Sequence, residues 1–172
     1  MRSRVEAGFT LVELLVVVAI IGILAAIAVP SLLRARMSGN EVSAVSAMRV
    51  INLSQLQYTS SCGNDGYAVS FPALAAIPPG ATQAFIPGEL AAPVPLKAGY
   101  TFALAAGVGA IAGVADCNGT PTQTAYYASA VPQLFGSTGG WSYATSQDNT
   151  VWRAFAAIAP AEPFGAPAVP IG

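Results

Sequence analysis

The hydrophobic pattern begins with a short polar head, which is followed by a long apolar stretch. From Phe9 to Val29 the only interruptions are Thr10, Glu13 and Gly22. At ~1.5 Å per residue this stretch would form a helix about 31 Å long, which matches the ~30 Å hydrocarbon core of a bilayer. The pattern therefore predicts a membrane-spanning helix over residues 9–29.

Glu13 is the unusual residue of this stretch. A carboxylate near the middle of a membrane helix costs about 2.5–3.5 kcal/mol, and less near an end, so such residues usually have a partner or a function. A secretory signal places its small-residue cleavage site after the apolar region, whereas here the pair Ala7 and Gly8 precedes it. We therefore expect the apolar segment to be retained in the mature protein.

Residues 30–58 predict an amphipathic continuation of the helix. The expected apolar stripe consists of Leu33, Met37, Val45, Met48, Ile51, Leu53 and Leu56. Its distal half should pack on a globular domain over residues 59–172. Pro30 costs the helix ~3 kcal/mol and Gly22 costs about 1 kcal/mol relative to Ala, so the stretch between them is weakened. This is compatible with a kinked transmembrane helix.

The pattern changes after Tyr58, where turn residues precede a possible helical turn over 70–77. Four runs rich in aromatic and β-branched residues then predict strands: Gly99 to Ala106, Thr122 to Val131, Gly140 to Thr145 and Thr150 to Phe155. We expect an α+β fold in which the long helix packs on an antiparallel sheet of about four strands. The Pro-rich tail, 160–172, is expected to be an extended surface segment.

Composition narrows the possible functions. The chain has 172 residues, of which 54% are hydrophobic and 9% charged, with seven Lys and Arg, eight Asp and Glu, and no His. This balance gives no basic surface for nucleic acid. The chain contains no Gly-x-Ser-x-Gly, no phosphate-binding loop and no clustered carboxylates, so we expect neither an enzyme nor a cofactor or metal. A sparsely charged surface suits packing against copies of itself.

Several polar motifs have simple structural interpretations. Asp65, Asp116 and Asp148 each lie within two residues of an Asn and predict turns. Residues 107–109 predict a flexible loop. Residues 116–120, Asp-Cys-Asn-Gly-Thr, fit an acceptor pattern of some bacterial glycosylation systems, but we favour an Asn-Gly turn there.

The run Gly8-Phe9-Thr10-Leu11-Val12-Glu13 with its apolar helix resembles the amino terminus of the type IV pilin family, which includes the pseudopilins of type II secretion. A looser similarity to bacterial major pilins extends to about Tyr58. The resemblance implies cleavage of a leader, residues 1–8, by a prepilin peptidase between Gly8 and Phe9, with N-methylation of Phe9. It also implies that Glu13 neutralises the amino group of Phe9 on an adjacent subunit.

Arg2 and Arg4 flank one end of the apolar helix and Arg34 and Arg36 the other, so charge alone does not orient it. The resemblance places the leader in the cytoplasm and the rest of the chain beyond the inner membrane. It also implies that the segment from Gly22 to Pro30 loses its helical structure inside the filament.

The only two cysteines, Cys62 and Cys117, would lie in the exported part of the chain. An even pair there indicates a disulfide, worth roughly 4 kcal/mol in the chain-entropy model. Two free thiols or half of a metal site are the alternatives.

The function that these features favour is a structural subunit of a type IV pilus-like filament. It would be a homo-oligomer, anchored in the inner membrane before assembly by the inner-membrane pilus machinery and extracellular afterwards. One alternative is a major pseudopilin, although the family's carboxy-terminal calcium site has no acidic counterpart in this sequence. The other is a monomeric membrane-anchored periplasmic binding domain, which leaves Glu13 unexplained.

Overall fold

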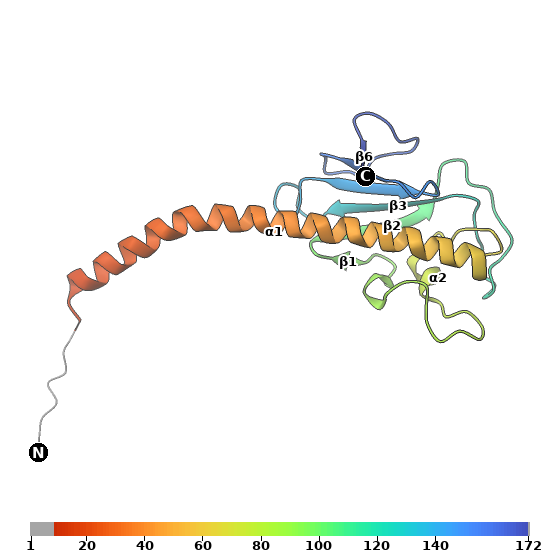
Figure 1. The fold of residues 1–172 in the computed structure, drawn as a ribbon, viewed down its shortest axis with the longest axis horizontal. Coiled ribbons are helices and arrows are strands. Elements are labelled where there is room, and N and C mark those ends of the chain that lie inside the picture. Colours follow the sequence, from red (N-terminus) through yellow and green to blue (C-terminus); the bar gives the residue numbers. More distant parts are fainter. Residues whose placement is uncertain (1–8, 172) are drawn as a thin grey trace, which may run out of the picture. The chain divides into compact units, whose positions relative to one another are not determined.

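The computed structural model describes residues 9–171 (Figure 1). Its longest element is the helix α1, Leu11–Ser61, which contains Pro30. The chain divides into two compact units, one up to Arg36 and one from Met37 onward. We call them the N-terminal unit and the globular unit, and α1 contributes residues to both.

The globular unit is built around one antiparallel sheet. Its strands are β1 (Leu96–Lys97), β2 (Tyr100–Ala106), β3 (Tyr126–Pro132), β4 (Ser142–Ser146), β5 (Val151–Ala154) and β6 (Val169–Ile171). Every strand pairs with its neighbours in chain order, from β1 to β6, so the sheet is a meander. Two short helices, α2 (Phe71–Ala75) and the 3₁₀ turn η1 (Gly88–Leu90), precede all six strands in the chain.

The α+β arrangement with an antiparallel sheet is confirmed. The sheet has six strands rather than about four, because a short edge strand is added on each side. The first, β1, has two residues and joins β2 through Ala98 and Gly99, whose φ angles of 49° and 73° suit a tight hairpin turn. The other edge strand, β6, lies in the tail that we expected to be an extended surface segment. Its Pro170 lies opposite Trp152, and an edge strand tolerates a proline because one side needs no donor.

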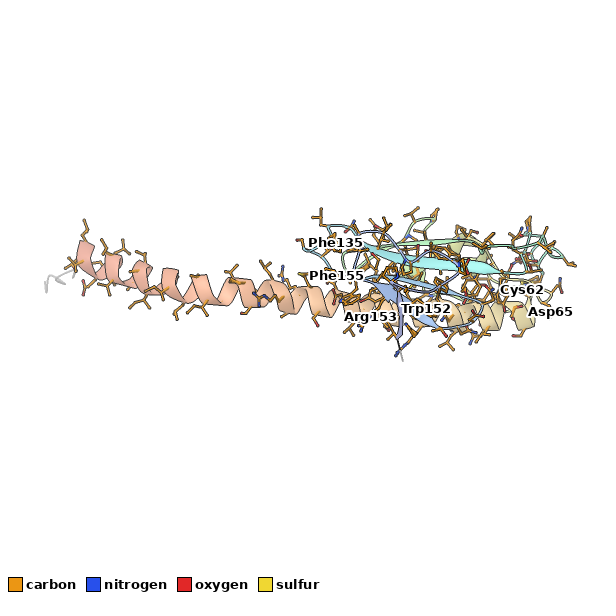
Figure 2. The ribbon with its side chains drawn as sticks, turned by 90° about the horizontal axis from the view of Figure 1, so that it is seen from above. Cys62, Asp65, Phe135, Trp152, Arg153 and Phe155 are labelled. Carbon is orange, nitrogen blue, oxygen red and sulfur yellow. A yellow bond between two sulfur atoms is a disulfide. The ribbon has the colours of Figure 1, made fainter. Side chains whose placement is uncertain are left out.

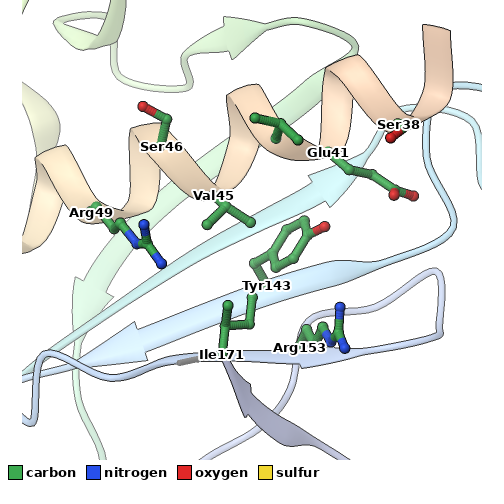
Figure 3. A pocket seen from close by; sticks show the side chains of 9 residues that line it. Ser38, Glu41, Val45, Ser46, Arg49, Tyr143, Arg153 and Ile171 are labelled. Atoms are coloured by element: carbon green, nitrogen blue, oxygen red, sulfur yellow. The ribbon is translucent and has the colours of Figure 1, made fainter. Parts of the chain in front are cut away.

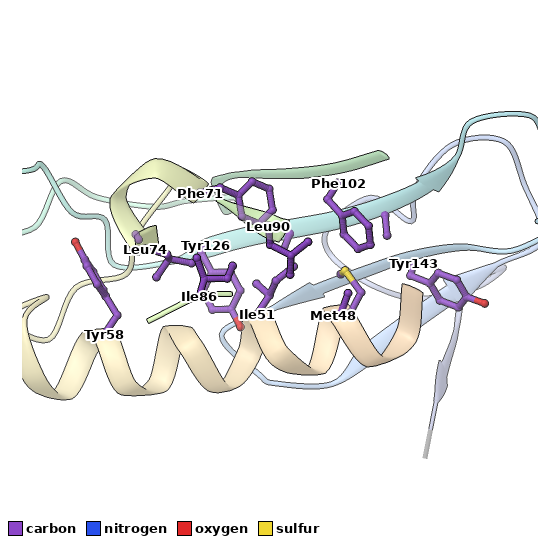
Figure 4. Packing of buried hydrophobic residues seen from close by; sticks show 14 of the residues in the cluster. Met48, Ile51, Tyr58, Phe71, Leu74, Ile86, Leu90, Phe102, Tyr126 and Tyr143 are labelled. Carbon is purple, nitrogen blue, oxygen red and sulfur yellow. The ribbon is translucent and has the colours of Figure 1, made fainter. Parts of the chain in front are cut away.

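The core of the globular unit lies between the sheet and one face of α1. The helix contributes Met48, Ile51 and Tyr58, which Figure 4 shows directed toward residues of the sheet and of the connecting segment. The larger residues that they meet are Phe71, Leu74, Ile86, Leu90, Tyr100, Phe102 and Tyr126. The distal half of the helix therefore packs on the sheet as expected, and the short helix over residues 70–77 is confirmed by α2.

Three polar residues on the buried face of α1 hold the loops that cover it. The side-chain amide of Gln55 donates to the Ala68 carbonyl oxygen at 2.6 Å and accepts from the Ala68 N–H at 3.1 Å. Asn52 Nδ2 donates to the Asn149 carbonyl oxygen at 2.9 Å. The Ser54 hydroxyl donates to the Phe85 carbonyl oxygen at 2.7 Å. Each of these buried side chains thus forms a hydrogen bond with the backbone of a loop.

The expected apolar stripe of the helix was partly wrong. Met48 and Ile51 are buried and Val45 packs against the core, but Leu53 and Leu56 are 60% and 44% exposed, and Leu33 is exposed in the N-terminal unit. At about 100° per residue, Leu53 lies about 200° around the helix from Ile51, on the opposite side. The helix buries a narrower face than its hydrophobic residues suggest, and polar residues fill part of that face.

The disulfide between Cys62 and Cys117 is confirmed and joins the end of α1 to the loop before β3. The two Cα atoms are 4.8 Å apart, and the Cys117 N–H donates to the Cys62 carbonyl oxygen at 2.8 Å. Next to it, the Tyr58 hydroxyl donates to Asp116 Oδ2 at 2.7 Å. Figure 2 shows Cys62 at one end of the globular unit, away from Phe135 and Phe155. Asp116 forms a turn, as expected, and is also buried.

Removing the disulfide should destabilise the globular unit by about 4 kcal/mol, because the crosslink closes a loop of 55 residues that is otherwise free in the unfolded chain. The measurement is the free energy of unfolding by urea, followed by circular dichroism on the full chain in detergent micelles, for the wild type and Cys62→Ser/Cys117→Ser. A reducing agent should lower the stability of the wild type but not that of the double variant. A difference below ~1 kcal/mol between the two proteins would contradict the prediction.

Burial of the tyrosine side chains perturbs their acidity. Burial, assisted by the Glu41 carboxylate, raises the pKa of Tyr143 to about 12. Burial also raises the pKa of Tyr100, Tyr126 and Tyr58, and at Tyr58 the hydrogen bond to Asp116 acts in the same direction. The core therefore holds these phenols in their neutral form.

The globular unit should lose stability in alkali. Because the folded pKa values are raised, the unfolded chain releases phenolic protons at lower pH than the folded chain does. This contribution to stability is complete below the ordinary tyrosine pKa of about 10. It is lost as the pH rises from there, toward about 12 in the case of Tyr143.

The check is the free energy of unfolding in urea between about pH 8 and 11, with phenolate absorbance measured in parallel. Tyr143→Phe should flatten the decline, because phenylalanine does not titrate. Ionisation of the buried tyrosines at their ordinary pKa without any loss of stability would contradict the prediction.

Candidate functional site

The start of α1 is closed by a reciprocal pair of side chains. Glu13 Oε2 accepts hydrogen bonds from the Thr10 backbone N–H at 3.0 Å and from the Thr10 hydroxyl at 2.6 Å. Thr10 Oγ1 in turn accepts from the Glu13 N–H at 3.3 Å. Thr10 is thus the N-cap and Glu13 the third residue of the helix, which is a capping box.

The capping box gives Glu13 a role within its own chain that the sequence analysis missed. The signal was present, because Thr-x-x-Glu before an apolar run is typical of a helix start. A negative charge at this position is also favoured by the helix dipole. Only Oε2 is used, since Glu13 Oε1 accepts no hydrogen bond from residues 9–171. One carboxylate oxygen therefore remains available to a cation from another molecule.

Phe9 lies one residue before the N-cap, and its side chain is 83% exposed. The structure therefore places Phe9 and Glu13 together at the open end of the helix, where another chain could reach both. Gly8, the expected residue before the cleavage point, lies outside the described residues, as does the rest of the expected leader. Cleavage, methylation and pairing between subunits stay predictions.

Behind this end, the N-terminal unit exposes an apolar helix surface. The large apolar side chains between Leu11 and Leu33 are 47–78% exposed, on all sides of the helix. Within the described part of the chain, α1 is the helix that is long and apolar enough to cross a membrane. An uncovered apolar surface of this extent requires lipid or other protein chains around it.

Gly22 and Pro30 lie inside this helix without interrupting it. The helix runs through both residues, and the Ser31 hydroxyl donates to the Ala28 carbonyl oxygen at 2.8 Å, one turn back. A Cβ atom added at Gly22 would meet no atom within 4 Å, so packing within the chain does not require a glycine there. The expected loss of helix between the two residues concerns an assembled filament and stays a prediction.

A surface pocket of about 320 Å³ lies between α1 and the strands β4 to β6 (Figure 3). Two of its charged side chains already have contacts in the globular unit. Glu41 Oε1 accepts from the Gly140 N–H at 2.8 Å, and the Arg153 guanidinium lies 4.5 Å from the centre of the Trp141 ring. Glu41 and Arg153 at this pocket therefore help to hold the globular unit together.

The other polar motifs of the sequence lie apart from one another. Residues 9–171 contain no group of three or more His, Cys, Asp or Glu that could hold a metal ion. Residues 107–110 form a turn, in which the Ala110 N–H donates to the Gly107 carbonyl oxygen at 3.1 Å. Asp65 and Asn149 have positive φ angles, as turn residues often do.

Comparison with protein families matches residues 3–29 to the family model of the prokaryotic N-terminal methylation motif. Comparison with curated proteins and with solved structures found no match. The matched range contains Gly8, Phe9, the capping box and the apolar part of α1 as far as Val29. The amino-terminal segment of this chain is therefore a prokaryotic N-terminal methylation motif of the prepilin type.

Proposed function

We propose that this protein is a structural subunit of a type IV pilus-like filament, cleaved by a prepilin peptidase between Gly8 and Phe9 and polymerised through the apolar part of α1. The observation that carries the proposal is the exposed apolar helix surface directly behind a capped, negatively charged helix start. The methylation motif over residues 3–29 supports the same processing.

The exposed surface explains why such a subunit needs two environments. Keeping one Leu, Ile or Val side chain from water is worth about 1.5–3 kcal/mol, and the helix exposes more than a dozen of them. Before assembly, a bilayer would cover them, with the helix spanning the inner membrane once and its amino terminus in the cytoplasm. In the filament, the same surface would be covered by the helices of neighbouring subunits. Assembly then exchanges one apolar environment for another.

Glu13 could bind a neighbouring subunit in the filament, because only one of its two carboxylate oxygens, Oε2, accepts hydrogen bonds from Thr10. Cleavage after Gly8 would create an amino group on Phe9, a cation in need of a partner inside a bundle of apolar helices. An unpaired buried charge costs several kcal/mol, so a pair between Glu13 and Phe9 of an adjacent subunit would fix their register. The bonds from Thr10 to Oε2 hold the carboxylate in place and leave Oε1 able to accept from the amino group of a neighbour.

Two features of the globular unit support export and packing. The disulfide between Cys62 and Cys117 is typical of proteins that fold in an oxidising compartment outside the cytoplasm. The outer face of α1 carries Leu53 and Leu56, and Phe135 and Phe155 contact each other edge to face on the surface of the sheet region. These exposed apolar groups suit contacts between subunits.

Imaging of filaments sheared from the cell surface, with mass spectrometry of their subunit, tests the proposal directly. Filaments made of this chain support it, and a protein found only as a membrane-bound monomer contradicts it. Loss of the filaments when the type II secretion machinery alone is deleted would assign the protein to the pseudopilins instead.

Processing provides a separate prediction. The mature chain should begin with N-methylated Phe9, because Gly8 immediately precedes the apolar helix and the motif covers both residues. Intact-mass measurement and amino-terminal sequencing of the membrane and filament pools decide this. A mature terminus beyond Val29, or an uncleaved Met1 in filaments, would contradict the pilin interpretation.

The capping box allows the charge of Glu13 to be tested separately from its role as a cap. Glu13→Gln removes the charge and keeps an oxygen that can accept from Thr10, whereas Glu13→Val removes both functions. Thr10→Val removes the hydroxyl and keeps the charge, at a cost of about 0.5–2 kcal/mol of helix stability.

If Glu13 pairs with Phe9 of a neighbour, both Glu13 variants should be cleaved normally and yet lose most filament yield, because losing one partner of a buried pair costs about 3–5 kcal/mol. Thr10→Val should lose less. The readout is surface filament yield relative to the mature membrane pool, in cells without the native copy. Normal yield from Glu13→Gln together with poor yield from Thr10→Val would show that Glu13 acts only as a cap.

A further inference from the structure

The chain contains two Asn-x-Ser/Thr triplets, the general acceptor pattern for N-linked glycans. One is Asn52-Leu53-Ser54 and the other is Asn118-Gly119-Thr120. Because a glycan is bulky and hydrophilic, only a triplet at the surface can carry one in the folded protein. The structure separates the two triplets clearly.

Asn52 lies in α1 and is only 5% exposed. Its Nδ2 atom donates to the Asn149 carbonyl oxygen at 2.9 Å, and its Oδ1 atom accepts from the Tyr126 hydroxyl at 3.0 Å. A sugar on Nδ2 would force its polar groups into the core, because the Asn52 side chain is enclosed there. Asn52 is therefore an internal control: it belongs to the same kind of triplet, but its side chain is too buried to carry a glycan.

Asn118 lies in the tight turn after the disulfide and is exposed. The Gly119 N–H donates to the Asp116 carbonyl oxygen at 2.9 Å, and Gly119 has a φ of +81°. No hydrogen bond joins the side-chain amide of Asn118 to any residue in the range 9–171. A Cβ atom built at Gly119 would meet nothing within 4 Å, so there is open space beside the turn.

Asp116, two residues before Asn118, holds the turn from inside. Its Oδ1 accepts from the N–H groups of Asn118, at 2.9 Å, and of Thr120, at 2.6 Å, while Oδ2 accepts from the Tyr58 hydroxyl. The disulfide at Cys117 fixes the turn on the other side. The backbone of the triplet is thus anchored to α1, and a substituent on the Asn118 amide would disturb none of these contacts.

We propose that Asn118 Nδ2 is the attachment site of an N-linked glycan. The donor is an oligosaccharide linked to a polyprenyl pyrophosphate, used by a membrane-bound oligosaccharyltransferase. A bond forms between Nδ2 and the anomeric carbon, and the bond from that carbon to the pyrophosphate oxygen breaks. The electron pair leaves with polyprenyl pyrophosphate, and Nδ2 loses one proton to a base of the transferase.

The inference rests on the proposed function in one respect, because the donor meets the chain only if residues after α1 are exported. The sugar would stand beside the disulfide, at the end of the globular unit where Figure 2 shows Cys62 and Asp65. It would cover with hydrophilic groups a surface that has few charges of its own.

The test uses the protein purified from the membranes and cell surface of the cells that make it. Intact mass, glycopeptide sequencing and amino-terminal analysis are measured for the wild type and three variants. We expect a wild-type mass increase of at least one sugar, located on Asn118. The increase should disappear in Asn118→Gln and Thr120→Ala and persist in Thr120→Ser, which keeps the triplet. The peptide that contains Asn52 should be unmodified.

The other outcomes overturn the proposal in distinguishable ways. An exported chain that begins at Phe9, contains the disulfide and has an unmodified Asn118 refutes the glycan and leaves the filament function standing. The same holds for a mass gain equal to deamidation alone, or for a sugar that persists in Asn118→Gln and therefore lies elsewhere. A chain that is never exported, with an uncleaved leader and free thiols, refutes both proposals.

Discussion

The apolar surface of α1 between Leu11 and Leu33 must be kept from water, and the other features of the protein depend on this constraint. The helix has hydrophobic side chains on all sides there, so no single sheet packed on one face could cover them. Lipid, or several neighbouring helices, can cover all sides of such a helix. The charge at Glu13 therefore has to lie at the very start of the helix, where Thr10 satisfies one of its oxygens before any partner arrives.

The part of α1 in the globular unit needs no lipid or neighbouring chain to cover its apolar face, because the sheet and the connecting segment pack on that face. Met48, Ile51 and Tyr58 fill the core, while Asn52 and Gln55 bind the backbone of the loops around it. Buried polar groups of this kind bring little net stability, but leaving them without partners is costly, so they favour one arrangement of the loops. The helix thus exposes apolar side chains in its first half and binds the loops of the globular unit in its second half.

Features that follow from long apolar runs or from residue pairs could be predicted from the sequence: the helix, the α+β class and the disulfide. Contacts between distant residues decided the rest. Leu53 and Leu56 match a helical stripe, yet the sheet meets the face that carries Asn52 and Gln55 instead. The two-residue strand β1 and the proline-containing β6 are too short or too atypical to be recognised without their partners. The capping box at Thr10 is a local feature, and the Thr-x-x-Glu spacing is enough to predict it.

The two edge strands of the sheet have a consequence for molecules of this protein at high local concentration. An open sheet exposes unpaired N–H and C=O groups along its outer strands, and these groups can recruit strands from other molecules. Here the outer strands are Leu96–Lys97, with two residues, and Val169–Ile171, which contains Pro170 and therefore lacks one donor. Neither offers a long row of free groups. Molecules concentrated side by side can therefore associate through their helices with little risk of amyloid-like pairing between their sheets.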